Sequence, residues 1–447
     1  MSKFRLIAPF MVAMLVLTAC PAADDGDGGA GASPGDGGDG GGESAEGDGT
    51  IVVTFLWGGA EGEAFEVVLD AFEEASGITV ESEPNRTDYQ AVLRTRIQGG
   101  NPPDVAIIPS AAFLRQLAAE GSIIPLADLG IERADIEGQF PPDVLDLGVV
   151  DGEQYAFLSK MNSKAAIFYS PERMEELGVD PTSVEDFEDL LTLTDDIKAA
   201  GATPWALGGG DSWTLTDNFE IMYLKEHGAE AYDTLFSAEG DWTDPTVMAT
   251  IDRMKELYTE DNVDGGIDGS MSTLFVDAIA KVFGTSPSAE LYYEATAVGG
   301  IATGVDVNPD LAGQEGTAID WVPFPTIDGN GAGLITWGGD QIGALVNDSD
   351  VAEFMQYMLT TDAAEVWAAE GTIVVPNVDA STDAYPNVIM QKDAELINSA
   401  EALRFDGSDL LPGGDLGAVL QSALRGEDMG PVLEEFQATV SAAWESQ

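Results

Sequence analysis

The sequence predicts an α/β protein built as two lobes behind a long N-terminal extension. Three observations indicate this fold class. Apolar strands alternate with amphipathic helices from residue 50, and strand patterns return near residue 317 after a mostly helical middle. Roughly 400 residues follow the extension, which is more than the ~250–300 that one hydrophobic core usually accommodates. A two-lobed α/β architecture accounts for all three.

The first strand and helix are the clearest elements. Residues 50–59 (TIVVTFLWGG) are apolar and β-branched and end in two glycines, which is typical of a buried strand. Apolar side chains then recur at helical spacing over residues 65–72, and Gly77 is expected to end that helix. Further strands and helices are expected in alternation at 78–83, 89–97, 105–109 and 113–117.

This alternation favours a mostly parallel sheet with crossover helices. Ligands of such sheets bind at the carboxyl ends of the strands, so the loops after residues 57, 83 and 108 are the expected rim of a site. The chain is expected to leave this lobe and re-enter it. The first lobe is assigned to residues 50–159 plus 285–358, and the second to 160–284 plus 359–447.

The first 19 residues have the features of a secretory signal peptide. Lys3 and Arg5 precede an apolar run over residues 6–17, and two small residues follow it. The run is shorter than the ~20 residues that a membrane-spanning helix needs. An uncleaved anchor helix is the alternative.

Cys20, the single cysteine of the chain, stands directly after this run. Residues 17–20 (LTAC) resemble the bacterial lipobox, which implies cleavage before Cys20 and attachment of lipid to its thiol. A lone cysteine has no disulfide partner within its own chain. Residues 21–49 hold no hydrophobic residue larger than alanine or proline, so we expect residues 20–49 to be the lipidated Cys20 and a disordered acidic tether. Weak calcium binding is the alternative there, but no EF-hand spacing is present.

The charge balance narrows the possible partners. Asp and Glu number 80 against 18 Lys and Arg, a formal net charge of −62. Nucleic acid is excluded as a partner because there is no basic surface for it. Hydrophobic residues still make up 44% of the chain, so it is a globular protein and not an acidic tail. Salt screens such self-repulsion, which favours a salt-rich or extracellular setting, with solubility alone as the alternative.

Most catalytic chemistries lack their residues. His227 is the single histidine, so a histidine-based zinc site or a Ser-His-Asp triad has little to draw on, and no Walker A motif is present. No cofactor or metal is expected. A secreted carbohydrate-active enzyme with paired carboxylates remains the alternative class, because acids are abundant. No repeat of eight barrel units supports it. A passive surface protein is a third possibility.

Several segments in order along the chain carry a family resemblance. They are VVTFLWGG, GGNPPDVAIIP, DGEQYAFLSKMNSKAAIFYSPERMEELGV and WGGDQIGALV. Together they resemble bacterial extracellular solute-binding proteins of ABC importers, in the maltose-binding-like class (family 1). The segments NSKAAIFYSP, TPWALGGG and RFDGSDLLPG resemble the α-glucoside-binding branch of that class.

The resemblance implies a type II periplasmic-binding-protein-like clamshell whose lobes are joined by a hinge of crossing strands. A sugar would bind between the lobes, and the protein would deliver it to the transmembrane permease subunits of the importer. The protein is expected as a monomer at the extracellular face of the cell membrane. Maltose, trehalose, sucrose, a longer glucan and glucose all stay open as ligands.

Sugars are bound by aromatic rings, which stack on their C–H faces, and by charged groups that form hydrogen bonds with their hydroxyls. Residues of these types gather at the expected rim loops and in the segments above. Glu61 and Asp340 stand at positions that resemble sugar ligands of the family. The full set of candidates is Trp57, Glu61, Arg86, Asp88, Tyr89, Lys164, Asp211, Trp213, Tyr292, Trp337, Gly339, Asp340, Arg404, Asp406 and Asp409. Trp205 is expected in the core.

Each candidate also has a structural explanation. Glu61 suits the N-terminus of a helix, Lys164 could pair with any of many acids, and Arg404 with its acidic neighbours could form an internal ion-pair network. Arg86 and Asp88 could form a solvated turn, and Tyr292 could pack in the core. Two departures from the family pattern leave the sugar undefined, a serine (Ser110) where some relatives have aspartate and no tryptophan near VFGTSP.

Overall fold

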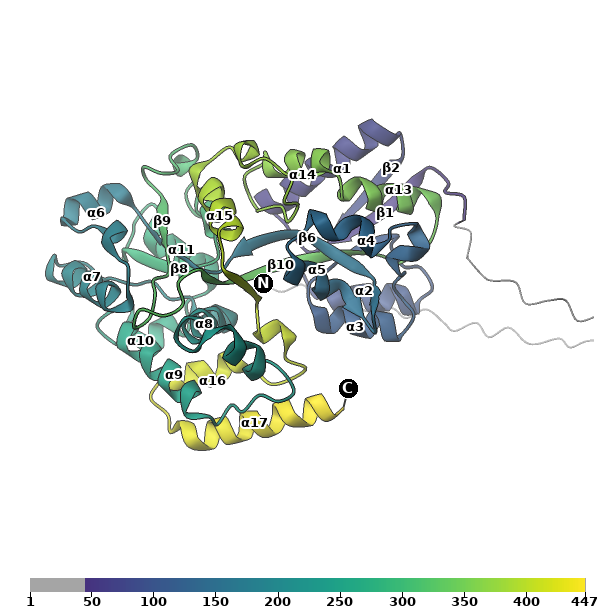
Figure 1. The fold of residues 1–447 in the computed structure, drawn as a ribbon. Helices are drawn as coiled ribbons and strands as arrows, with labels where there is room; N and C mark the ends of the chain where they lie inside the picture. Colours follow the sequence, from purple (N-terminus) through teal and green to yellow (C-terminus); the bar gives the residue numbers. More distant parts are fainter. Residues whose placement is uncertain (1–44, 447) are drawn as a thin grey trace, which may run out of the picture. The chain divides into compact units, whose positions relative to one another are not determined.

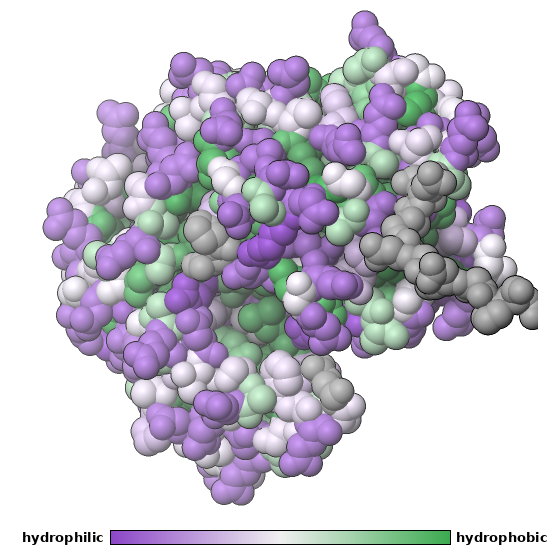
Figure 2. Space-filling view, turned by 45° about the vertical axis from the view of Figure 1, so that its right-hand side comes forward, coloured by the Kyte–Doolittle hydropathy of each residue, from purple (hydrophilic) through white to green (hydrophobic). Residues whose placement is uncertain are grey.

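The computed structural model describes residues 45–446 of the chain (Figure 1). The expected signal peptide, the lipidated Cys20 and the tether up to residue 44 lie outside the described residues. Within the described range, no helix has both the length and the apolar character needed to cross a membrane. Hydrophilic residues cover most of the face in Figure 2, and hydrophobic residues show mainly in the recesses between them.

The first sheet gathers strands from distant parts of the chain. Its order is β11-β10-β3-β1-β2, and β6 pairs with β10. Strand β1 runs parallel to β2 and β3, as the sequence predicts, whereas β10 runs antiparallel to β3 and β6. Its strands are β1 (Thr50–Phe55), β2 (Thr79–Pro84), β3 (Val105–Ile108), β6 (Ala156–Ser163), β10 (Leu334–Ala344) and β11 (Ala402–Phe405). Strands β4 (Val149–Val150) and β5 (Glu153–Gln154) form a separate hairpin.

Helices from both ends of the chain pack on this sheet. Helix α1 ends where predicted, because Gly77 adopts a left-handed φ of 78° and its N–H caps the carbonyl of Glu73. Helix α14 packs against α1, and α13 contacts β1 and β10. The helices of this part are α1 (Ala60–Ser76), α2 (Tyr89–Gln98), α3 (Ala111–Ala119), α4 (Arg133–Ile136), α5 (Pro142–Leu145), α13 (Ser349–Met358) and α14 (Thr361–Ala368).

The second sheet is small and antiparallel, with the order β8-β7-β9, and its strands β7 and β8 are fully buried. Its strands are β7 (Ala166–Tyr169), β8 (Leu291–Glu294) and β9 (Asp320–Pro323). Helices cover it, as predicted for the middle of the chain, and Trp205 is fully buried as expected. The helices of this part of the protein are α6 (Pro171–Leu177), α7 (Phe187–Ala199), α8 (Trp213–Leu235), α9 (Pro245–Leu257), α10 (Gly266–Ser270), α11 (Phe275–Phe283), α12 (Val298–Ala302), α15 (Val388–Asn398), α16 (Leu416–Leu424) and α17 (Met429–Glu445).

Short 3₁₀ turns connect many of these elements. They are η1 (Leu126–Leu129), η2 (Glu137–Gln139), η3 (Asp146–Gly148), η4 (Pro181–Ser183), η5 (Gly209–Asp211), η6 (Pro309–Leu311), η7 (Thr382–Ala384) and η8 (Ser408–Leu410). Two of them matter for the site below. Turn η5 leads into α8, and η8 follows β11.

Two long strands join the sheets. Strand β10 pairs with β3 through its C-terminal half and with β11 through its N-terminal half, and β6 pairs antiparallel along both halves. After Ser163, β6 continues through two residues into β7 of the second sheet. The pairing of β6 with β10 shifts at a bulge between Asp340 and Gln341. These crossing strands are those that the sequence leads one to expect at the hinge (Figure 1).

The strand pairing differs from the expected division of the chain in three segments. Strands β8 and β9 lie in 285–358, the range assigned to the first lobe, but they pair with β7 of the second sheet. Helix α14 lies in the range assigned to the second lobe but packs on α1. Residues 45–49, expected in the tether, lie against the start of α13, where Gly47 and Gly49 donate to Ser349 and Asp350. Local patterns identify strands and helices but not their long-range partners.

Candidate ligand-binding site

The first charged cluster of the candidate site surrounds Lys160 on the crossing strand β6. The Lys160 ammonium binds the carboxylate of Glu61, in the first turn of α1, and Oδ2 of Asp340 at 3.1 Å. The indole N–H of Trp57 donates to the same Asp340 oxygen at 2.8 Å, and the ammonium lies 5.0 Å from the centre of the Trp57 ring. We call Lys160, Glu61, Asp340 and Trp57 the Lys160 cluster.

A bulge in β6, where Ser159 is the extra residue opposite Asp340 and Gln341 of β10, shapes this cluster. Asp340 stands where the pairing with β6 shifts, and its carbonyl accepts the hydroxyl of Ser159 at 2.7 Å. Gly339 leaves room for the close approach of the two strands, since a Cβ there would lie 2.2 Å from the carbonyl oxygen of Lys160. Burial opposes the charge of Lys160, yet the carboxylates of Glu61 and Asp340 raise its pKa above the usual value.

The second charged cluster surrounds Lys164, between β6 and β7. Its ammonium binds Asp217 of α8 at 2.8 Å and the carboxylate of Asp406, which follows β11. Asp217 is fully buried and Asp406 is 4% exposed. Gly338 makes room for the lysine, because a Cβ on this glycine would lie 2.7 Å from Cε of Lys164. Burial disfavours the charge of Lys164, but its two carboxylate partners raise its pKa well above the usual value.

Further buried acids stand beside this pair. Glu220 accepts hydrogen bonds from the Tyr232 hydroxyl at 2.8 Å and from the backbone N–H of Gly407 at 2.7 Å. Burial, and then the charge of Asp217, raise the pKa of Glu294 well above its usual range. Burial likewise raises the pKa of Glu220. We call Lys164, Asp217, Asp406, Glu220 and Glu294 the Lys164 cluster.

Several predicted residues present an exposed group beside these clusters. Trp213 is 42% exposed, lies 4.9 Å from the Phe275 ring, and has the Lys164 ammonium 5.8 Å from its centre. Asp409 is exposed on η8, a turn that helix α3 contacts. Arg86 and Asp88 are exposed on the loop after β2, where the Arg86 side chain lies over Gly58. A ligand at the clusters can reach such groups without unfolding the protein.

Other predicted residues are used in packing. The Tyr89 ring is buried, and its hydroxyl donates to the carbonyls of Thr54 and Ile107. Trp337 is 1% exposed and packs edge-on against Phe405, with ring centres 5.0 Å apart. Tyr292 is 1% exposed in β8. Their rings are covered by protein, so a sugar cannot stack on them in this conformation.

Three predicted polar or aromatic residues have structural partners. Asp211 accepts the backbone N–H of Phe275 at 2.5 Å and so fixes the turn before α8. Arg404 forms an ion pair with Asp233 at 2.6 Å. Trp57 is 4% exposed and packs edge-on against Phe65, with its ring plane at 89°. For Trp57 the polar N–H edge belongs to the cluster, whereas the ring belongs to the core.

Sequence reasoning missed Lys160, Asp217, Glu220 and Glu294. Lys160 carried a usable signal, because a lysine within a strand pattern is rare in a chain with 18 Lys and Arg. Residues 160 and 164 also share one face of an extended chain. The acids carried no signal, since a chain with 80 acids has one in almost every helix. Among residues 45–446, no group of three or more metal-binding side chains is placed to hold a metal ion.

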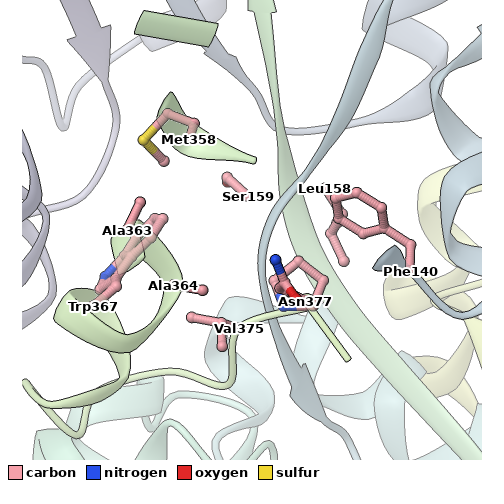
Figure 3. Close-up of a pocket in the computed structure, with 10 residues that line it drawn as sticks. Phe140, Leu158, Ser159, Met358, Ala363, Ala364, Trp367, Val375 and Asn377 are labelled. Carbon is pink, nitrogen blue, oxygen red and sulfur yellow. The ribbon is translucent and has the colours of Figure 1, made fainter. Parts of the chain in front are cut away.

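A small cavity lies between β6, α14 and the segment at residues 375–377 (Figure 3). Ser159, Trp367 and Asn377 are among the residues that line it, and Trp367 also packs against Trp57, with ring centres 5.6 Å apart. Its volume of about 20 Å³ suits one water molecule and not a sugar. The cavity therefore belongs to the support of the cluster.

Comparison with known proteins identifies the family. Residues 57–365 match the model of the bacterial extracellular solute-binding protein family. The chain is 28% identical over 409 residues to the alpha-glucosides-binding periplasmic protein AglE of Rhizobium meliloti, which covers 89% of this chain and 87% of the relative. It is 27% identical over 417 residues to the osmoprotective compounds-binding protein GgtB of Synechocystis, with 92% of each chain covered.

Solved structures share the fold. The bacterial solute receptor AcbH superposes with a TM-score of 0.75 at 19% identity, covering 90% of this chain and 99% of the receptor. The solute-binding protein RafE in complex with raffinose superposes with a TM-score of 0.67 at 18% identity, covering 88% and 99%. The expected type II clamshell fold is thereby confirmed. The chain belongs to the bacterial extracellular solute-binding protein family.

Proposed function

We propose that this chain is the substrate-binding protein of an ABC sugar importer and captures an α-glucoside or a related oligosaccharide between its two sheets. One observation carries the proposal. Two charged clusters stand on the crossing strands β6 and β10, and the exposed ring of Trp213 lies beside one of them. The name of AglE supports α-glucosides as the ligand class. Other similar proteins are named for chitin oligosaccharides and raffinose, so we keep oligosaccharides other than α-glucosides within the proposed ligand class.

The chemistry of the clusters fits sugar hydroxyls. Carboxylates accept hydrogen bonds from hydroxyl groups, and an ionised group makes a bond roughly twice as strong as a neutral one. Glu61 and Asp340 supply such oxygens, and the side chain of Glu61 is 33% exposed. The Trp213 ring supplies an apolar platform for the C–H face of a sugar. Asp409 adds a second exposed carboxylate across from α3.

The proposed mechanism is capture without chemistry. A sugar that contacts both sheets favours the conformation in which they approach each other, and it shifts the equilibrium only by its difference in affinity for the two conformations. The pairing of β6 with β10 shifts beside Asp340, so the proposed hinge and the proposed ligand contacts would share this strand pair. We assign each lobe to one of the two sheets with its covering helices. The permease would then recognise the sugar-bound conformation.

The proposed location follows from the N-terminal sequence. Residues 1–19 act as a signal peptide, and lipid on Cys20 holds the protein at the extracellular face of the membrane as a monomer. Several acyl chains at ~0.8 kcal/mol per buried CH₂ would make such anchoring stable. Mass spectrometry of the protein from its membrane fraction tests this, because a lipid-modified Cys20 must be the first residue of the mature chain.

Thermal unfolding with a panel of α-glucosides tests the binding function. A ligand at 100 times its Kd adds ~2.7 kcal/mol to stability, which corresponds to a rise of a degree or more in Tm for a protein of this size. We expect at least one disaccharide or oligosaccharide to raise the Tm and to be recovered unchanged. Hydrolysis of the sugar would instead indicate a carbohydrate-active enzyme.

A further inference from the structure

A second cavity lies close to the Lys160 cluster and has the size of a ligand site. Its volume is about 340 Å³, within the ~300–1,000 Å³ that small-molecule sites usually have. It is lined by the start of α1, by α12 and by the loops around residues 370–372 and 386–389. By volume it has room for a sugar unit, unlike the small cavity of Figure 3.

The position of this cavity connects it to the proposed site. Ala60 lines it, and the next residue, Glu61, binds Lys160. Helix α1 belongs to the first sheet, whereas α12 follows β8 of the second sheet. The cavity therefore has walls from both parts of the protein, and a ligand that touches Glu61 can extend into it past the N-terminus of α1.

The lining of the cavity fits a polyhydroxyl ligand. Glu315 and Glu370 bring carboxylates, and Asn387 brings a side-chain amide. The hydroxyl oxygen of Thr372 is buried and has no hydrogen-bond partner among the described residues. Such a group is costly to bury unless something bonds to it. Acidic walls disfavour an anionic ligand but accept hydrogen bonds from neutral hydroxyls.

A glycine keeps the cavity open. Gly300 lies on α12, and the nearest atom to a Cβ built on it is Cα of Thr372, at 3.9 Å. Ordinary van der Waals contact begins at such a distance, so a small side chain fits and a larger one would reach into the cavity.

We propose that this cavity is a second sugar chamber, which holds the units of an oligosaccharide that extend beyond those bound at the Lys160 cluster. The proposal rests on the proposed function and adds to it the length of the ligand. The preferred ligand is then longer than a disaccharide, and its far units contact Thr372 and Glu370.

The test measures how affinity depends on the number of sugar units, in the wild-type protein and in variants whose cavity is filled. Isothermal titration calorimetry measures the affinity of the wild-type protein for glucose, maltose, maltotriose and maltotetraose, and for sucrose, raffinose and stachyose. The same titrations use Gly300→Leu, which fills the cavity. Gly300→Ala is the conservative control, and Gly430→Leu, at an exposed position of α17, controls for an added leucine.

We expect affinity in one of the two series to rise about tenfold or more beyond the disaccharide for the wild-type protein and both controls. Gly300→Leu should lose this rise and keep disaccharide affinity within about twofold. Thr372→Val keeps the shape of the lining, so it should weaken binding of the longer sugars alone, even where Gly300→Leu does not fold. No rise in the wild-type protein, or an equal rise in Gly300→Leu and Thr372→Val, would overturn the second chamber. Absence of binding by every sugar would overturn the proposed function itself.

Discussion

The lysines of the Lys160 and Lys164 clusters lie four residues apart, one within β6 and one just after it, but the clusters differ in charge balance and in access to water. Lys160 has two carboxylate partners, and the side chain of one of them, Glu61, is 33% exposed. Lys164 stands among four carboxylates that are buried almost completely, Asp217, Asp406, Glu220 and Glu294. A single lysine cannot balance four ionised acids, and burial raises the pKa of Glu220 and Glu294 accordingly.

This difference indicates that the two clusters have different roles. Glu61 can turn from Lys160 to a ligand hydroxyl at little cost, because water already reaches it. Asp217 cannot leave Lys164 without leaving a buried charge unpaired, which is expensive. The Lys160 cluster is therefore the adaptable contact for a ligand, and the Lys164 cluster is the fixed support of the crossing strands. The predictions below test this contrast.

The largest effect is expected from removing Lys164. Lys164→Met leaves Asp217 and Asp406 buried without their cation, so we expect a loss of about 3–5 kcal/mol in the free energy of unfolding. Lys160→Met should cost about half as much, since Glu61 can turn to solvent. Urea denaturation of both variants at high salt makes the comparison. Equal losses, or a larger loss for Lys160→Met, would contradict the contrast.

Stability should also fall as pH rises through the range set by Asp393, which lies behind the Lys164 end of β6. Asp393 is fully buried, accepts the backbone N–H of Ser163 at 3.3 Å, and burial raises its pKa from 3.8 to about 6. As pH rises, this carboxyl loses its proton in the unfolded chain before it does in the folded protein. Its contribution to the free energy of unfolding is therefore complete below pH ~4 and is lost between pH ~4 and ~6, by on the order of 2–3 kcal/mol.

Asp393→Asn tests this dependence because the amide cannot ionise. The variant should have a flatter stability profile between pH 4 and 6 when measured by urea denaturation at high salt, where general charge repulsion is screened. Asp128→Asn removes one charge from an exposed aspartate and serves as the control. A profile of Asp393→Asn as steep as that of the wild-type protein would show that another group sets the slope.

A smaller effect is expected at Trp213. Trp213→Ala removes the exposed ring beside Lys164, so we expect sugar affinity to fall about tenfold, or ~1.4 kcal/mol. Calorimetric titration with the sugar of the largest thermal shift measures it. Leu274→Ala is the matched control, because Leu274 is 50% exposed just before Phe275 and is not part of either cluster. A loss of affinity in the control as large as in Trp213→Ala would move the platform elsewhere.

The smallest effect concerns a cation that belongs to neither cluster. Arg115 of α3 is half-buried, and its Nε and Nη2 atoms are buried with no hydrogen-bond partner among the described residues. Burial lowers its pKa. Unlike the two lysines, it has no carboxylate partner among the described residues to offset desolvation, so Arg115→Met should raise the free energy of unfolding by about 1 kcal/mol. A lower Tm for Arg115→Met than for the wild-type protein would show that the guanidinium has a stabilising role.

The parts of the fold that follow from local patterns could be predicted from the sequence. Helix α1 and its end at Gly77 follow from periodicity and a left-handed glycine. The membership of β8 and β9 could not be predicted, because a four-residue apolar strand carries no mark of its partner. Long-range pairing depends on the whole chain.

The same limit applies to the site. The predicted residues Lys164, Asp406 and Trp213 do come together, and the predicted Asp340 meets Glu61 and Trp57 around Lys160. Trp337 is a predicted ligand contact because it stands beside two glycines in an expected loop. In the structure, strand β10 runs through this segment and the Trp337 ring is buried. The sequence does not distinguish an aromatic residue beside glycines that faces a ligand from one that faces the core.

A crystal structure of the chain with the sugar that gives the largest thermal shift tests the central claim most directly. The account predicts sugar hydroxyls within about 3.2 Å of the carboxylates of Glu61 or Asp340, and a sugar ring stacked on Trp213. It also predicts that Lys164 keeps its contacts with Asp217 and Asp406. A sugar bound on another face, or one that contacts neither cluster, would contradict the account.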